Sequence, residues 1–164
     1  MSASVPVTRS SLPRVFPIAA PLSMPELPAR IFTDEEWQQI RLGYQAQDMD
    51  ERWDVFTEDQ VVFLHRSWTG YGIYEASLTP ADGGGWRIGT AVVESDPDRY
   101  RRSSHDYDRV LLELLLVTIV LGQPAAALRA ELVTLATQNA RSDVPAGLVE
   151  HHAVGWRAPS KADR

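Results

Sequence analysis

Four segments in the middle of the chain carry the β-branched and aromatic residues that strands prefer. They cover residues 53–56, 61–66, 71–78 and 86–94, and polar or glycine-rich turns separate them. In the second segment both faces are partly apolar, which favours a central strand covered on each side. Because the connections are short, neighbouring strands are expected to be antiparallel. The pattern therefore predicts a four-stranded antiparallel β-meander.

Helical spacing precedes and follows these segments. Thr33 stands before three carboxylates, a typical N-cap and first turn, and predicts a helix over residues 34–46. The most hydrophobic stretch, 107–121, contains Glu113 and is shorter than the roughly 20 apolar residues that cross a bilayer, so it predicts a buried core helix. Leucines at helical spacing predict another helix over 125–140. The expected fold class is α+β, with the meander packed against C-terminal helices and one N-terminal helix.

Proline content divides the chain into three expected parts. Residues 1–30 hold six of the 11 prolines and are expected to form a flexible, extended tail. Residues 31–142 are expected to form a single α+β domain, and 143–164 an irregular C-terminal tail that includes His151 and His152. Four apolar side chains of the first tail could still dock on the domain: Val15, Phe16, Ile18 and Leu22.

Composition narrows the class of protein. With 164 residues, of which 44% are hydrophobic, the chain has enough material for one sizeable core. The formal net charge of -6 argues against non-specific binding to nucleic acid or to an anionic membrane, both of which need a basic surface. There is no cysteine, which excludes disulfides and thiolate sites and favours a cytoplasmic location. No motif implies a cofactor.

One turn of the meander concentrates the side chains that can bind a ligand. An imidazole, a guanidinium, two hydroxyls, an indole and a phenol surround one glycine at the expected hairpin tip, in the sequence His65-Arg66-Ser67-Trp68-Thr69-Gly70-Tyr71. Such a set suits a planar or anionic ligand. Ser67 and Thr69 could donate hydroxyls to phosphate, although turn hydroxyls often bond their own backbone.

Three of these residues each allow two interpretations. Arg66 offers a fork of donors that matches phosphate or carboxylate, or it forms a structural ion pair with Asp54 or Glu75 on adjacent strands. His65 could act as a general base or ligand donor, or be a half-buried histidine that shares a face with apolar residues. Trp68 either stacks on a base or a partner side chain, or folds back on the core.

The strand register gives no complete catalytic set. If the loop is 67–70, Arg66 pairs with Tyr71 and His65 with Gly72, and continuing this register places Glu75 opposite Val62. The only candidate acid for His65 is thus too far along the strand for a nucleophile–base arrangement. No metal site is expected either, because the aspartates around 96–108 lie in a solvated linker and adjacent histidines face different directions.

Two further stretches of the sequence carry residues that can bind an anion. Gly83-Gly84-Gly85 precedes a strand rather than a helix, so it predicts a hairpin turn and not a phosphate loop. The cluster Arg99-Tyr100-Arg101-Arg102 is a better anion contact, but the aspartates on both sides favour a solvated loop.

The segment from Arg52 to Leu78 resembles a small bacterial domain in which a Trp-Asp strand precedes an H-R-S-W-T-G hairpin and an I-Y strand. The resemblance covers under a fifth of the chain. It implies a setting near ADP-ribose-processing macro-domain proteins and no particular mechanism.

Two classes of function follow from the hairpin. The first is a module that binds a small anionic, aromatic ligand of the nucleotide or ADP-ribose type, with Arg66 and Arg87 or Arg101 on phosphate and Trp68 or Tyr71 on the base. The second is a protein-interaction module, such as an immunity or antitoxin-like partner of an effector, anchored by Trp68. A hydrolase of an ADP-ribose or phosphoester linkage ranks third. A concave positive pocket would favour the ligand, and a flat apolar patch rimmed with acids the protein partner.

Overall fold

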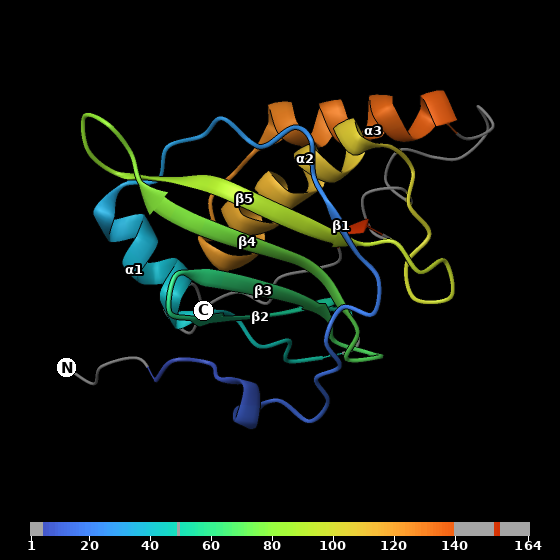
Figure 1. Ribbon diagram of the computed structural model, residues 1–164, viewed down its shortest axis with the longest axis horizontal. Coiled ribbons are helices and arrows are strands. Elements are labelled where there is room, and N and C mark those ends of the chain that lie inside the picture. The colour runs from blue at the N-terminus through green and yellow to red at the C-terminus, as the bar shows by residue number, and fades with distance from the viewer. Residues whose placement is uncertain (1–4, 49, 140–152, 155–164) are drawn as a thin grey trace.

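The protein folds as one antiparallel sheet with helices on one face and an N-terminal segment on the other (Figure 1). The computed structural model describes residues 5–48, 50–139 and 153–154. The sheet has the strand order β1-β5-β4-β3-β2. Its strands are β1 (Pro21–Ser23), β2 (Trp53–Glu58), β3 (Val61–Arg66), β4 (Gly72–Pro80) and β5 (Trp86–Glu94).

The four predicted strands are confirmed as β2 to β5, but the sheet has five strands and not four. The additional strand, β1, pairs antiparallel with β5 through Leu22 and Val93. It was missed because three residues that begin with proline show no alternation. Pro21 carries no backbone donor, which is tolerated at the edge of a sheet. Only the exposed edge of β5 makes this segment a strand.

The faces of the sheet follow from the register. Residues that pair across neighbouring strands share a face, and so do residues two positions apart in one strand. Leu64 pairs with Val55 on one side and with Tyr74 on the other, and Trp53 is two residues before Val55. The face that packs against the helices therefore carries Trp53, Leu64 and Tyr74. Phe56 and His65 lie on the other face. Both faces of β3 are therefore covered, as its two-sided apolar pattern predicts.

The helices lie on the side of the first face, namely α1 (Asp34–Leu42), α2 (His105–Leu114) and α3 (Ala126–Asn139), and α3 packs on α2. A π-helical segment, η2 (Leu115–Val120), continues α2, and all of its residues are buried. The predicted helices over 107–121 and 125–140 are thus found with slightly different bounds, and residue 140 lies outside the described part. Among the described residues, none of the helices is long and apolar enough to span a membrane.

Helix α1 begins as predicted and ends earlier. Thr33 accepts a hydrogen bond from the Glu36 amide at 3.0 Å, and the Glu36 carboxylate accepts one from the Thr33 amide, which completes a capping box. The expected end at residue 46 is wrong because Gly43, with φ 74°, stops the helix at Leu42. A Cβ at Gly43 would lie 2.2 Å from the Val55 carbonyl oxygen, so the chain can pass β2 here only as glycine.

The part of the proline-rich segment that precedes β1 packs against the second face of the sheet. Its short 3-10 helix η1 (Arg9–Ser11) brings Arg9 to an ion pair with Glu58 at 2.9 Å, with the guanidinium 5.0 Å from the Phe56 ring centroid. Phe16 forms a parallel bridge with Tyr71 at the hairpin. These contacts fit the alternative in which apolar side chains of the N-terminal segment dock on the domain, and they do not fit a separate flexible tail. The division of the chain at residues 31 and 143 stays a prediction.

Candidate ligand-binding site

The β3–β4 hairpin forms largely with the predicted register. The Arg66 amide donates to the Tyr71 carbonyl at 2.9 Å, and His65 pairs with Gly72. Gly70 has φ 79°, the left-handed conformation that the turn requires. A β-bulge between Leu64 and His65 then shifts the pairing, so Glu75 lies opposite Phe63 and not Val62.

Beside the hairpin lies a pocket of about 230 Å³ that is rich in arginine. Its lining consists of Arg52, Arg66, Trp68, Thr69 and Arg99. Three of these five residues are candidates from the sequence, and Arg52 and Arg99 are additions. Three guanidiniums around one concave surface create a local positive field in a chain whose net charge is -6. A concave positive pocket is the feature that the ligand-binding interpretation predicts.

Arg52 is placed by Ser67. The Ser67 amide donates to the Arg52 carbonyl at 2.9 Å, and the Ser67 hydroxyl donates to the Glu51 carbonyl at 2.8 Å. Ser67 thus bonds backbone, as the second of its two interpretations expects, and does not line the pocket. The Arg52 guanidinium carbon lies 4.6 Å from the Trp68 ring centroid. Its Nε is buried without a hydrogen-bond partner among the described residues.

Arg66 lies on the helix-covered face, stacked on a buried tryptophan. Its guanidinium carbon is 4.5 Å from the ring centroid of Trp53, the residue opposite it on β2. The expected alternative of an ion pair with Asp54 or Glu75 is wrong, because both carboxylates lie on the other face of the sheet. Burial lowers the pKa of Arg66, and the charge of Arg52 adds to this effect. A guanidinium nonetheless stays charged.

Arg99 reaches the pocket from the linker between β5 and α2. Its Nη1 donates to the Pro17 carbonyl at 3.1 Å, and its guanidinium carbon lies 4.6 Å from the Tyr71 ring centroid. Tyr71 in turn contacts Phe16, with the ring centroids 5.9 Å apart. Tyr71 therefore supports an arginine rather than lining the pocket itself, and the N-terminal segment supports both.

The linker is fixed to the sheet by Glu94, whose side chain is buried. Its carboxylate accepts hydrogen bonds from the amides of Ala19 at 2.6 Å, Ala20 at 2.9 Å and Asp96 at 3.0 Å. Burial alone would raise the pKa of Glu94, but these donors and the nearby Arg99 outweigh burial and lower it. Glu94 therefore remains ionised and holds the N-terminal segment and the linker together.

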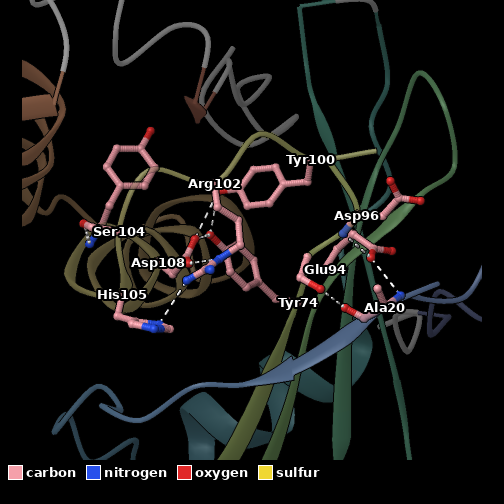
Figure 2. A network of polar contacts seen from close by, with 11 residues as sticks. Ala20, Tyr74, Glu94, Asp96, Tyr100, Arg102, Ser104, His105 and Asp108 are labelled. Atoms are coloured by element: carbon pink, nitrogen blue, oxygen red, sulfur yellow. Dashed lines mark hydrogen bonds and ion pairs between the residues drawn. The ribbon is translucent and has the colours of Figure 1, made fainter. Parts of the chain in front are cut away.

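A buried polar network anchors the residue after Arg99 (Figure 2). The Tyr100 hydroxyl lies 2.9 Å from the Tyr74 hydroxyl and 3.3 Å from Asp108 Oδ1, and Tyr74 donates to the same oxygen at 2.8 Å. The other carboxylate oxygen of Asp108 accepts from Arg102 Nε at 3.0 Å. Burial and the Asp108 carboxylate raise the pKa of Tyr100, so this phenol stays protonated. The network fixes the linker and with it the position of Arg99.

His65 lies on the far side of the sheet from the pocket. It is buried, its Nδ1 is 2.9 Å from the Gly70 carbonyl oxygen, and its ring packs on Phe56 with centroids 5.3 Å apart. Burial lowers its pKa, although the hydrogen bond to Gly70 opposes this. Asp54, directly opposite on β2, is buried as well, and burial raises its pKa. Neither side chain lines the pocket, so they supply no general base there.

Other expected contacts lie elsewhere. Arg87 pairs with Thr79 at the end of the sheet opposite to the hairpin, about 23 Å away at 3.3 Å per residue along β4. It cannot share a small ligand with Arg66, so its inclusion in the site is wrong. Arg101 is exposed and does not line the pocket. Within the described residues, no group of three His, Asp or Glu side chains could hold a metal ion, and His151 and His152 lie outside them.

No protein-family model, curated protein or solved structure matches this chain. The hairpin resemblance therefore stays an expectation. Sequence reasoning missed Arg52 because it looked like the last polar residue before a strand. Its place directly before Trp53, which pairs with Arg66, was the available indication. Arg99 is part of the arginine cluster at residues 99–102, but the neighbouring aspartates favoured the prediction of a solvated loop there.

Proposed function

We propose that the protein binds a small anionic, aromatic ligand of the nucleotide or ADP-ribose type at the pocket beside the β3–β4 hairpin. The observation that carries this proposal is the convergence of Arg52, Arg66 and Arg99 with Trp68 and Thr69 on one concave surface. Guanidiniums bind phosphate through two parallel hydrogen bonds, and an arginine stacked on an aromatic ring keeps its donors directed.

The size of the pocket suggests which part of the ligand would enter. Sites that enclose a drug-sized ligand have roughly 300–1,000 Å³, whereas this pocket has about 230 Å³. It suits a phosphate or diphosphate group better than a whole nucleotide. The base would then stack on Trp68, whose side chain is 48% exposed at the rim. Base stacking on an aromatic side chain contributes about 1–3 kcal/mol.

The experiment is a thermal-shift titration of the full-length protein with ADP-ribose, NAD and ATP. A ligand at 100 times its Kd stabilises the native state by about 2.7 kcal/mol, or roughly 5–10 °C for a chain of this size. Arg52→Gln and Arg99→Gln should abolish the shift. Arg87→Gln removes an equally charged, exposed side chain at the opposite end of the sheet and should leave it unchanged.

A further variant separates the two halves of the proposed ligand. Trp68→Ala should weaken ADP-ribose roughly 5- to 150-fold, from the stacking energy above. It should weaken inorganic pyrophosphate less, because that ligand has no base to stack and loses only the ring that packs on the Arg52 guanidinium. If none of the three nucleotides shifts the melting temperature, or if Arg87→Gln has the same effect as Arg52→Gln, the proposal is wrong.

The second candidate, a protein-interaction module of the immunity or antitoxin type, is favoured by the exposure of Trp68. Exposed tryptophan and arginine are frequent hot spots. The surroundings of Trp68 are basic and not acidic, so such a partner would present an acidic surface. A pull-down with wild-type and Trp68→Ala protein would test it after a negative nucleotide titration. A hydrolase stays the third candidate, because none of the described residues that line the pocket is a candidate general base.

A further inference from the structure

A larger groove lies at the opposite end of the sheet from the hairpin pocket. It has about 560 Å³, within the range of small-molecule sites, and runs between helix α1, the β2–β3 turn and the adjoining ends of β4 and β5. This is the end of the sheet where α1 lies in Figure 1. Its lining includes two tryptophans, Trp37 and Trp86, and four polar side chains from α1 and the turn: Gln38, Arg41, Asp59 and Gln60.

The aromatic part of the groove is preorganised. Trp86 and Trp37 lie with ring centroids 5.2 Å apart, and Trp37 is almost wholly buried. The Trp86 indole N–H donates to Asp34 Oδ1 at 3.0 Å, and its backbone forms two 2.7 Å hydrogen bonds with Phe32. The indole plane of Trp86 is therefore held in place before any ligand arrives, and a flat apolar face can pack on it.

The fold uses little of the polar part of the groove, apart from Arg41, whose guanidinium carbon lies 6.0 Å from the Trp37 ring centroid. Within the described part of the chain, the side chains of Gln38, Asp59 and Gln60 make no hydrogen bond, and Arg41 has no carboxylate partner. These groups offer donors and acceptors in similar numbers, and the charges of Arg41 and Asp59 cancel.

This balance indicates the chemistry of the ligand. Asp59 disfavours a phosphate or carboxylate in the groove, and Arg41 disfavours a cation. Hydroxyl groups both donate and accept, and the amides of Gln38 and Gln60 can do the same for two adjacent hydroxyls. A neutral ring with one apolar face and a hydroxyl-bearing edge satisfies all of these groups, as a sugar ring does.

The groove also continues. An adjoining hollow of about 310 Å³ shares Gln38, Arg41 and Asp59 with it and extends along α1 to Pro6 of the N-terminal segment. Three shared residues make the two hollows one elongated surface. An extended chain of rings would contact both parts, whereas a single ring would occupy only one.

We propose that the groove between α1 and the β2–β3 turn is a second binding site, for a neutral oligosaccharide, with Trp86 as the stacking platform and Gln38 and Gln60 as hydroxyl-binding groups. The site is independent of the hairpin pocket, because the two lie at opposite ends of the sheet and share no lining residue.

The test is a ¹H–¹⁵N NMR titration of the full-length protein with maltose, cellobiose and N,N′-diacetylchitobiose, each to about 20 mM. The five tryptophans give separate indole signals, and that of Trp86 is assigned with Trp86→Phe. At least one sugar should shift the Trp86 signal saturably, and its tetrasaccharide should bind at least about fivefold more tightly. Gln60→Ala should weaken binding about tenfold, whereas Arg52→Gln in the hairpin pocket should not change it.

Gln38 and Gln60 are exposed, so their alanine variants keep the fold and the test does not depend on Trp86→Ala. The proposal is overturned if no sugar of the three moves the Trp86 indole signal. It is equally overturned if the shifts persist unchanged in both Gln38→Ala and Gln60→Ala. A shift with the neutral peptide tetraalanine, in the absence of any shift with sugars, would make the groove a peptide site instead.

Discussion

The buried carboxylate of Asp108 should be among the strongest single contributors to stability, and Asp108→Asn tests this directly. Asparagine keeps the size of the side chain and an oxygen that can still accept from Tyr74. It replaces the oxygen that accepts from Arg102 Nε at 3.0 Å with an amide nitrogen. Two hydrogen-bond donors then face each other in a buried site, since the Asp108 side chain is fully buried.

The magnitude follows from two parts. Losing a hydrogen bond to a charged group costs about 1.5–3 kcal/mol, and the lower end applies because the Arg102 side chain is 22% exposed and can turn partly to solvent. The unsatisfied amide adds about 1–3 kcal/mol to this loss, and part of it is offset because the variant no longer has to bury a charged carboxylate. We therefore expect the free energy of unfolding to fall by about 2–3 kcal/mol and the Tm by about 4–12 °C.

The assay is equilibrium urea unfolding followed by circular dichroism, with Asp106→Asn as the matched control. Asp106 lies in the same first turn of α2, so both variants lose the same favourable interaction with the helix dipole. Its side chain is 55% exposed and 4.0 Å from Arg109, and the expected loss is below about 1 kcal/mol. Equal losses in the two variants, at unchanged m-values, would refute the view that the Asp108 network holds the linker.

Two further predictions concern the hairpin. Because burial lowers the pKa of His65, the unfolded chain takes up a proton at a higher pH than the folded chain, so stability should fall as the pH drops below about 6.5. Urea unfolding between pH 7.5 and 5 should show this fall in the wild type and a flatter profile in His65→Asn. Identical profiles in the two proteins would contradict the prediction. Gly70→Ala should lower the free energy of unfolding by about 2–3 kcal/mol, because the new Cβ would lie 2.7 Å from the Arg14 side chain. In Gly83→Ala the φ is similarly positive but no atom lies within 4 Å of the new Cβ, so the loss should be about 1 kcal/mol. Equal losses in thermal denaturation would show that the N-terminal segment does not pack against Gly70.

Local sequence patterns predicted the elements of this fold well. The N-cap at Thr33 and the two-sided apolar pattern of β3 depend on residues within a few positions of one another, and each is found as expected. The strand β1 and the end of α1 at Gly43 were not predictable in this way. Both depend on contacts with β5 and β2, whose positions no local pattern contains.

The candidate site likewise combines residues that a local pattern predicts with residues that only long-range contacts bring together. The sequence by itself determined that a hairpin would bring Arg66, Trp68 and Thr69 together, because neighbours along a chain stay neighbours in a tight turn. Only the tertiary structure decided that Arg52 and Arg99 join them and that His65 and Arg87 do not. Pleating turns His65 to the opposite face from Arg66, and the length of β4 carries Arg87 to the far end of the sheet. Convergence of distant residues is a property of packing, and packing is set by the core as a whole.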